Sequence, residues 1–92
     1  MNNNDSTPNE LFSVAVFSDG PGKTIPEERV MVGKGGSVTV LFFPEFGCMV
    51  RTVIVDGMPT GGYNRESNSY TFKNVSEKHT LRVEFTEPSG NA

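Results

Sequence analysis

The sequence predicts an all-β fold, a small antiparallel β-sandwich or open barrel of about six strands. Apolar and polar residues alternate along most of the chain, which places one set of side chains in a core and the other in water. Glycine, proline and Asp-Gly turn signals interrupt the chain at short intervals. No window sustains the 3.6-residue period of an amphipathic helix, so we expect less than about a tenth of the chain to be helical.

The first three strands are expected at 11–17, 29–33 and 37–43. Each carries valine or phenylalanine at every second position, which assigns one face to the core. The inward residues expected here are Phe12, Val14, Val16, Val30, Val32, Val38, Val40 and Phe42.

The last three strands are expected at 49–55, 69–74 and 80–86. The stretch RTVIVDG reads as a half-buried strand that runs into a tight turn, because Asp-Gly tolerates the positive φ that such a turn requires. Leu81, Val83 and Phe85 give the clearest inside–outside alternation of the chain, and we expect Phe72 to join them in the core.

A chain of 92 residues is expected to form one domain. Residues 1–10 and 88–92 are polar and rich in Asn, Ser, Pro and Gly, so we interpret them as disordered tails around a single β domain at 11–87. A domain of this size has one thin core and little room for a deep internal active site.

Composition excludes several function classes. The net charge is −3, the pI is about 5.0, and the basic residues form no run, so nucleic acid is not expected as a partner. No apolar segment approaches the length of a membrane span, so we expect no membrane insertion. The N-terminus shows no signal peptide, which leaves a cytoplasmic protein or one whose secretion signal was removed or lies upstream.

No residue pattern predicts catalysis, a metal or a cofactor. Cys48 is the single cysteine, and its apolar surroundings favour a small buried side chain over a nucleophile activated by His79, the single histidine. A structural role for His79 is favoured over catalysis or metal binding, because no second histidine accompanies it. Asp56 is interpreted as a turn residue, and the alternative is that it binds a cation. We therefore predict that the protein is not an enzyme.

PEFGCMVRTVIVDG followed by SYTFKNVSEKHTLRVEF resembles the divergent B-repeat modules of bacterial surface and secreted proteins, over about residues 12–86. The matching positions are Gly36, Ser37, Pro44, Gly47, Val50, Val53, Val55, Asp56, Gly57, Ser69, Tyr70, Thr71, Phe72, Asn74, Val75, His79, Thr80, Val83 and Phe85. The chain departs from those repeats at Cys48, where they carry a tyrosine, and in a longer connection between Asp56 and Tyr70. The resemblance implies a small, usually non-catalytic β module with an adhesion or spacer role, in which His79 opens the last strand.

Two segments are candidate binding surfaces. The loop 57–68 offers Tyr63, Asn64 and Arg65 among small polar residues, a mixture typical of protein-binding loops; a loop tip without a partner is the alternative. The segment LFFPEFGCM holds more apolar side chains than one strand face accommodates. Either the core absorbs them, or Phe43, Phe46 and Met49 form an exposed patch that contacts a partner.

Three functions remain open. The leading hypothesis is a protein-interaction, spacer or adhesion module of a bacterial surface or secreted protein. The second is a small intracellular protein that binds and inhibits or adapts another protein. A phage-encoded protein is one form of this hypothesis. The third is a carbohydrate-binding β module in which tyrosine and phenylalanine rings stack on sugars, although the chain has no tryptophan.

Overall fold

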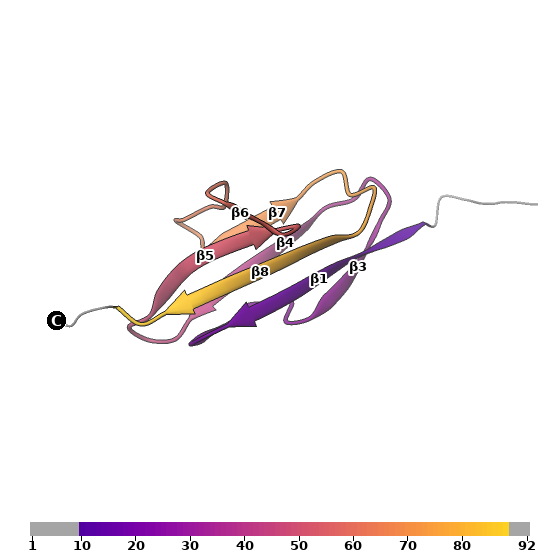
Figure 1. Cartoon of the computed structure of the whole chain (residues 1–92). Helices are drawn as coiled ribbons and strands as arrows, with labels where there is room; N and C mark the ends of the chain where they lie inside the picture. The colour runs from indigo at the N-terminus through magenta and orange to yellow at the C-terminus, as the bar shows by residue number, and fades with distance from the viewer. Residues whose placement is uncertain (1–9, 89–92) are drawn as a thin grey trace, which may run out of the picture.

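A computed structural model describes residues 10–88, in which eight β-strands and no helix are present (Figure 1). The all-β prediction is confirmed, and the expected number of strands was too low. The strands are β1 (Leu11–Asp19), β2 (Gly22–Ile25), β3 (Arg29–Gly33), β4 (Val38–Pro44), β5 (Met49–Val55), β6 (Met58–Thr60), β7 (Ser69–Phe72) and β8 (His79–Thr86). Residues 1–9 and 89–92, which hold most of the two predicted tails, lie outside the described residues.

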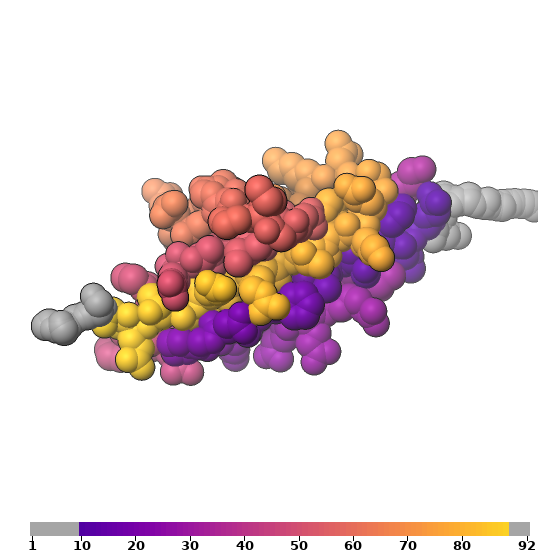
Figure 2. Space-filling model, in the orientation of Figure 1, coloured from indigo at the N-terminus to yellow at the C-terminus, as the bar shows by residue number. Residues whose placement is uncertain are grey.

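The strands form two sheets. Sheet A has the order β3-β1-β8-β5-β6, and sheet B has the order β2-β4-β7. Figure 1 shows β4 and β7 behind β5 and β8, and the space-filling view in Figure 2 shows β1, β8 and β5 side by side on the outward face of sheet A. No helix in the described chain is long and apolar enough to cross a membrane.

The strand β1 changes its partner along its length. Leu11 to Ala15 pair with β3 in an antiparallel ladder, whereas Val14 to Asp19 pair with β8 in a parallel one. The prediction that all strands are antiparallel was therefore wrong for this pair. Alternation identifies the buried side of a strand, but it carries no information on which strand lies next to it or in which direction.

The core lies between the two sheets and is built from both. Sheet A contributes Val14, Val16, Val32, Val53, Leu81, Val83 and Phe85, and sheet B contributes Val40, Phe42 and Phe72. Val75, in the connection from β7 to β8, completes this buried cluster. The predicted burial of Phe72, Val83 and Phe85 is confirmed.

The alternation pattern does not predict β2 or β6. In β2 the inward side chain is Thr24, which is fully buried, opposes Phe42 on β4 and donates its hydroxyl hydrogen bond to the Pro26 carbonyl at 2.9 Å. A buried threonine does not register as apolar alternation, so the strand is invisible to that pattern. The strand β6 has three residues, and Pro59 at its centre argues against a strand from sequence.

Candidate functional site

The Asp56-Gly57 turn joins β5 to β6 as a two-residue hairpin. Both residues have positive φ, +53° for Asp56 and +85° for Gly57, and the ladder closes at Val55 opposite Met58. This geometry is that of a type I′ turn, which matches the right-handed twist of the flanking strands. The interpretation of Asp56 as a turn residue is confirmed.

The Asp56 carboxylate also ties this hairpin to β8. Its Oδ2 lies 2.7 Å from Nδ1 of His79, and its Oδ1 accepts a hydrogen bond from the backbone N–H of Thr80 at 2.8 Å. The backbone N–H of Asp56 donates to the Thr80 carbonyl at 3.0 Å. His79 is the first residue of β8, as the resemblance implied, and its ring packs 5.0 Å from that of Phe72. The sequence predicted a structural role for each residue but not that the two side chains meet.

This Asp–His contact has the geometry of a structural clamp. Within residues 10–88 no group of three His, Cys, Asp or Glu side chains is arranged to hold a metal ion. The carboxylate accepts from both the backbone and the ring, so its hydrogen bonds fix the start of β8 against the β5–β6 turn.

The loop 57–68 is more ordered in its geometry than a free tip. After β6, the backbones of Asn64 and Ser69 form a bridge with hydrogen bonds of 2.8 and 3.1 Å in the two directions. The Asn64 side-chain oxygen accepts from the N–H groups of Glu66 and Ser67, each at 2.9 Å. Local side-chain to backbone bonds of this kind define a turn. The side-chain oxygen of Asn64 therefore makes its hydrogen bonds within the loop.

Tyr63 and Arg65 stack on one another at the base of this loop. The Tyr63 ring is half-buried, packs against the core and lies 6.0 Å from the ring of Phe42, centre to centre. The guanidinium of Arg65, which is exposed, lies 4.9 Å from the centre of the Tyr63 ring. Tyr63 lies outside the alternating strands, but its ring reaches the core from the loop. Arg65 remains available to a partner.

The segment 41–49 leaves most of its apolar side chains in water. Phe42 alone is buried; Leu41, Phe43, Phe46 and Met49 are exposed, Phe46 fully. The core therefore does not absorb these side chains, and their contact with a partner stays a prediction. The four residues do not share one face, however, because Phe43 lies on β4 of sheet B and Met49 on β5 of sheet A, opposite Thr86.

The outward face of sheet B carries a compact apolar patch that includes Ile25, a residue the sequence reasoning missed. Ile25 on β2 is directly opposite Leu41 on β4, and Phe43 lies two residues further along the same face. These three side chains are 49%, 38% and 42% exposed, respectively. We call Ile25, Leu41 and Phe43 the sheet B patch. Ile25 was missed because its strand was missed.

Polar residues border the sheet B patch. Lys23 stands opposite Phe43, and Thr39 stands opposite Thr71, with their hydroxyl oxygens 2.8 Å apart. An apolar centre with a polar border is the arrangement found at protein interfaces.

Cys48 lies in the turn between β4 and β5 and is half-buried, not fully buried as expected. Its Sγ contacts the Phe46 carbonyl at 3.9 Å. Desolvation, followed by the nearby carboxylates of Glu87 and Glu45, raises the pKa of the Cys48 thiol. A raised pKa lowers the thiolate fraction, which is the reactive form, so this cysteine has neither the charge nor the partners of a nucleophile.

We compared the chain with known protein families, curated proteins and solved structures. No protein-family model, curated protein or solved structure matches the chain.

Proposed function

We propose that this protein is a non-enzymatic protein-binding module, folded as a β-sandwich, whose contact surface is the sheet B patch. The observation that carries the proposal is the pairing of Ile25 with Leu41 beside Phe43 on one outward sheet face. Burying such side chains against a partner removes apolar surface from water. Each Å² buried contributes about 25 cal/mol of favourable free energy. Contiguous apolar patches on otherwise polar surfaces usually mark interaction sites.

The sandwich assignment rests on how the core is shared. Buried residues of both sheets form one cluster, and the chain crosses between the sheets at every connection from β1 through β5. Two sheets that bury their inner faces against each other leave each outer face to solvent or to a partner.

Two features support a module that binds rather than catalyses. The ring of the single histidine makes structural contacts with Asp56 and Phe72. The raised pKa of the single cysteine disfavours its thiolate form and therefore nucleophilic chemistry. The resemblance to B-repeat modules favours a surface or secreted protein with an adhesion or spacer role as the setting, and an intracellular binding protein is the alternative.

The loop residues Tyr63, Asn64 and Arg65 are a second part of the proposed contact surface. Arg65 is exposed and held over a fixed ring, which reduces the side-chain entropy that binding would cost. Arginine and aromatic residues dominate interface energetics. Phe46 and Met49, the other two exposed residues first assigned to a partner, lie at the end of the molecule where β4 turns into β5.

The test compares partner binding by the wild type with that of the double variant Leu41→Thr/Phe43→Thr. Threonine keeps the strand propensity of these positions, so the fold is expected to persist. Partners are enriched from a native lysate or culture on immobilised protein, and each is then purified and titrated by calorimetry. We expect binding to weaken at least about tenfold, or 1.4 kcal/mol.

The matched control is Met31→Thr/Met58→Thr, which removes two exposed methionines from sheet A. It should leave the affinity unchanged. Equal weakening by both double variants would contradict a specific role for the sheet B patch. An Arg65→Ala variant tests the loop separately, because it leaves the packing of Tyr63 on Phe42 in place.

A further inference from the structure

Four strands form the edges of the two sheets, and three of them are poorly suited to further pairing. The strand β6 has Pro59 at its centre, which lacks an N–H group to donate. In β7, Ser69 is bridged to Asn64 by backbone hydrogen bonds in both directions, and in β2, Thr24 is fully buried. The fourth is β3, which Figure 1 shows beyond β1 at the border of sheet A. Within residues 10–88, neither a proline nor a neighbouring strand blocks its outer side.

Backbone hydrogen bonds show which residues of β3 face β1. The Lys34 N–H donates to the Glu10 carbonyl at 3.0 Å, and the Glu28 carbonyl accepts from the Val16 N–H. In an antiparallel pair, every second residue directs both of its polar groups to the partner strand. The even-numbered residues of 28–34 therefore direct their N–H and C=O groups toward β1.

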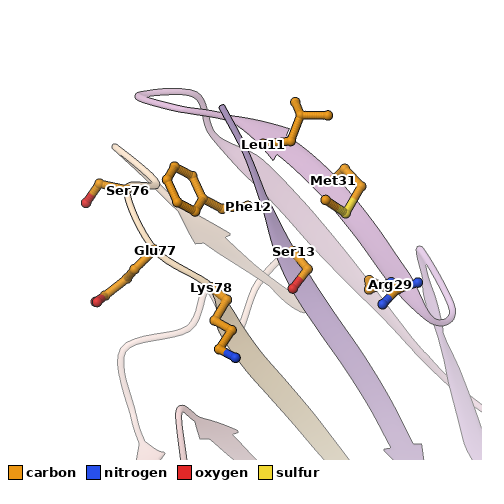
Figure 3. Close-up of a pocket in the computed structure, with 8 residues that line it drawn as sticks. All are labelled: Leu11, Phe12, Ser13, Arg29, Met31, Ser76, Glu77 and Lys78. Carbon is orange, nitrogen blue, oxygen red and sulfur yellow. The ribbon is translucent and has the colours of Figure 1, made fainter. Parts of the chain in front are cut away.

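The odd-numbered residues of β3 direct their polar groups to the outer side. These residues are Arg29, Met31 and Gly33, and all three are exposed. The Gly33 carbonyl accepts from the Gly36 N–H at 2.8 Å, so the turn after β3 uses this group. The Gly33 N–H and both polar groups of Arg29 and Met31 are left for another strand. Figure 3 shows the Arg29 and Met31 side chains along β3.

We propose that β3 pairs antiparallel with β3 of a second copy of this chain, about a twofold axis at Met31. Met31 then lies opposite Met31 of the second copy, and Arg29 lies opposite Gly33. Each hydrogen-bonded pair of this ladder joins two residues whose polar groups face outward. A register centred on Met31 also leaves no residue of Arg29–Gly33 without a partner.

Charge complementarity favours a second copy as the occupant. The same register places Glu28 opposite Lys34 of the second copy, and the twofold axis repeats this pair at the other end of the ladder. These are non-hydrogen-bonded positions, where opposing side chains lie closest. A shift of two residues would instead place Lys34 opposite Val30 or Pro26, so the charges select this register.

Both charged side chains are accessible for the contact. Glu28 is exposed and takes part in none of the three ion pairs of the described residues. Lys34 lies 3.3 Å from Glu10, and each of these two side chains is 60% exposed. An exposed ion pair of this kind restrains its side chains only weakly, so Lys34 is free to turn toward Glu28 of the second copy.

The contact is small, so the dimer is weak. Five residues paired edge to edge bury less than the roughly 1,200 Å² of a stable interface. We expect a dissociation constant between about 10 µM and 1 mM. The twofold axis is perpendicular to the continuous sheet, so both copies of sheet B lie on the same side of it. If the proposed function holds, the dimer presents two sheet B patches to a multivalent partner; the dimer itself does not depend on that function.

The experiment is sedimentation equilibrium on the full chain at concentrations from about 10 µM to 1 mM. We expect a monomer–dimer equilibrium. Over the same range, amide hydrogen exchange measured by NMR should slow at the N–H groups of Met31 and Gly33. Exchange at Val30 and Val32 should stay unchanged, because their N–H groups already face β1.

Charge variants test the register. Glu28→Lys should weaken dimerisation at least about fivefold, because two attractions become repulsions. Glu27→Lys is the matched control: it changes the net charge equally, one position away, and lies opposite Gly35 in this register, so its effect should stay within about twofold. Lys34→Glu should weaken dimerisation as Glu28→Lys does. An equimolar mixture of these two weakened variants should regain the wild-type affinity, because opposite charges again face each other in the mixed dimer.

Four results would overturn the proposal. They are a wild type that stays monomeric at about 1 mM, equal effects of Glu27→Lys and Glu28→Lys, no recovery in the mixture, and exchange at Met31 that does not depend on concentration. Loss of the dimer in Leu41→Thr/Phe43→Thr would likewise overturn it, by placing the contact on the sheet B patch. If Lys34→Glu does not fold, as judged by circular dichroism, the comparison of Glu27→Lys with Glu28→Lys decides the register alone.

Discussion

At the scale of single residues, the Asp56–His79 pair shows how one side chain serves two purposes. Asp56 adopts the positive φ that a type I′ turn requires, and its carboxylate then reaches the first two residues of β8. The turn itself was predictable, since Asp-Gly after a patterned strand is a strong hairpin signal. The contact with His79 was not, because it joins residues 23 positions apart through the pairing of β5 with β8.

Replacing Asp56 by alanine should lower the free energy of unfolding by about 2 kcal/mol, because two hydrogen bonds are lost and alanine is strained at positive φ. Asp56→Asn is the matched control, since asparagine tolerates the same φ and keeps an oxygen acceptor for the Thr80 N–H; it should cost about half as much or less. Urea unfolding followed by circular dichroism measures both values. Equal losses for the two variants would contradict the role assigned to the side chain.

At the scale of elements, the six strands expected from alternation are present with small shifts at their ends. Apolar periodicity found β1, β3, β4, β5, β7 and β8 because each carries valine, leucine or phenylalanine on its inner face. The strands β2 and β6 lack that signal. What marks β2 in the structure is close packing, since Gly22 lies against the ring of Phe85 on β8. From sequence alone, Gly22 indicates only a turn, and its packing against the Phe85 ring cannot be recognised.

Gly22→Ala should therefore destabilise the protein by about 1–3 kcal/mol, because the added methyl group would lie 2.6 Å from carbon atoms of the Phe85 ring. Gly33→Ala provides the control. Gly33 is also a strand residue, and an added methyl group there meets no atom within 4 Å, so the change should be neutral to within about 0.5 kcal/mol. Thermal or urea unfolding of both variants decides the point, and a tolerated Gly22→Ala would mean that β2 does not pack on β8 as described.

At the level of the whole molecule, residues of both sheets contribute to one buried cluster. Sequence predicted the all-β class and most of the core, but not the division into sheets of five and three strands or the parallel pairing of β1 with β8. Those depend on which strands meet, and alternation is silent on that. The sheet B patch follows from the same division, because Ile25 and Leu41 become neighbours only when β2 pairs with β4.

Phe42 and Phe43 are adjacent in sequence but differ in burial: Phe42 lies in the core, and Phe43 belongs to the exposed sheet B patch. Solvent paramagnetic relaxation enhancement measures this directly on the side-chain protons of dilute protein. We predict strong enhancement for Ile25, Leu41 and Phe43 and little for Phe42. Protection of Leu41 and Phe43 equal to that of Phe42 would show that the sheet B patch is not exposed.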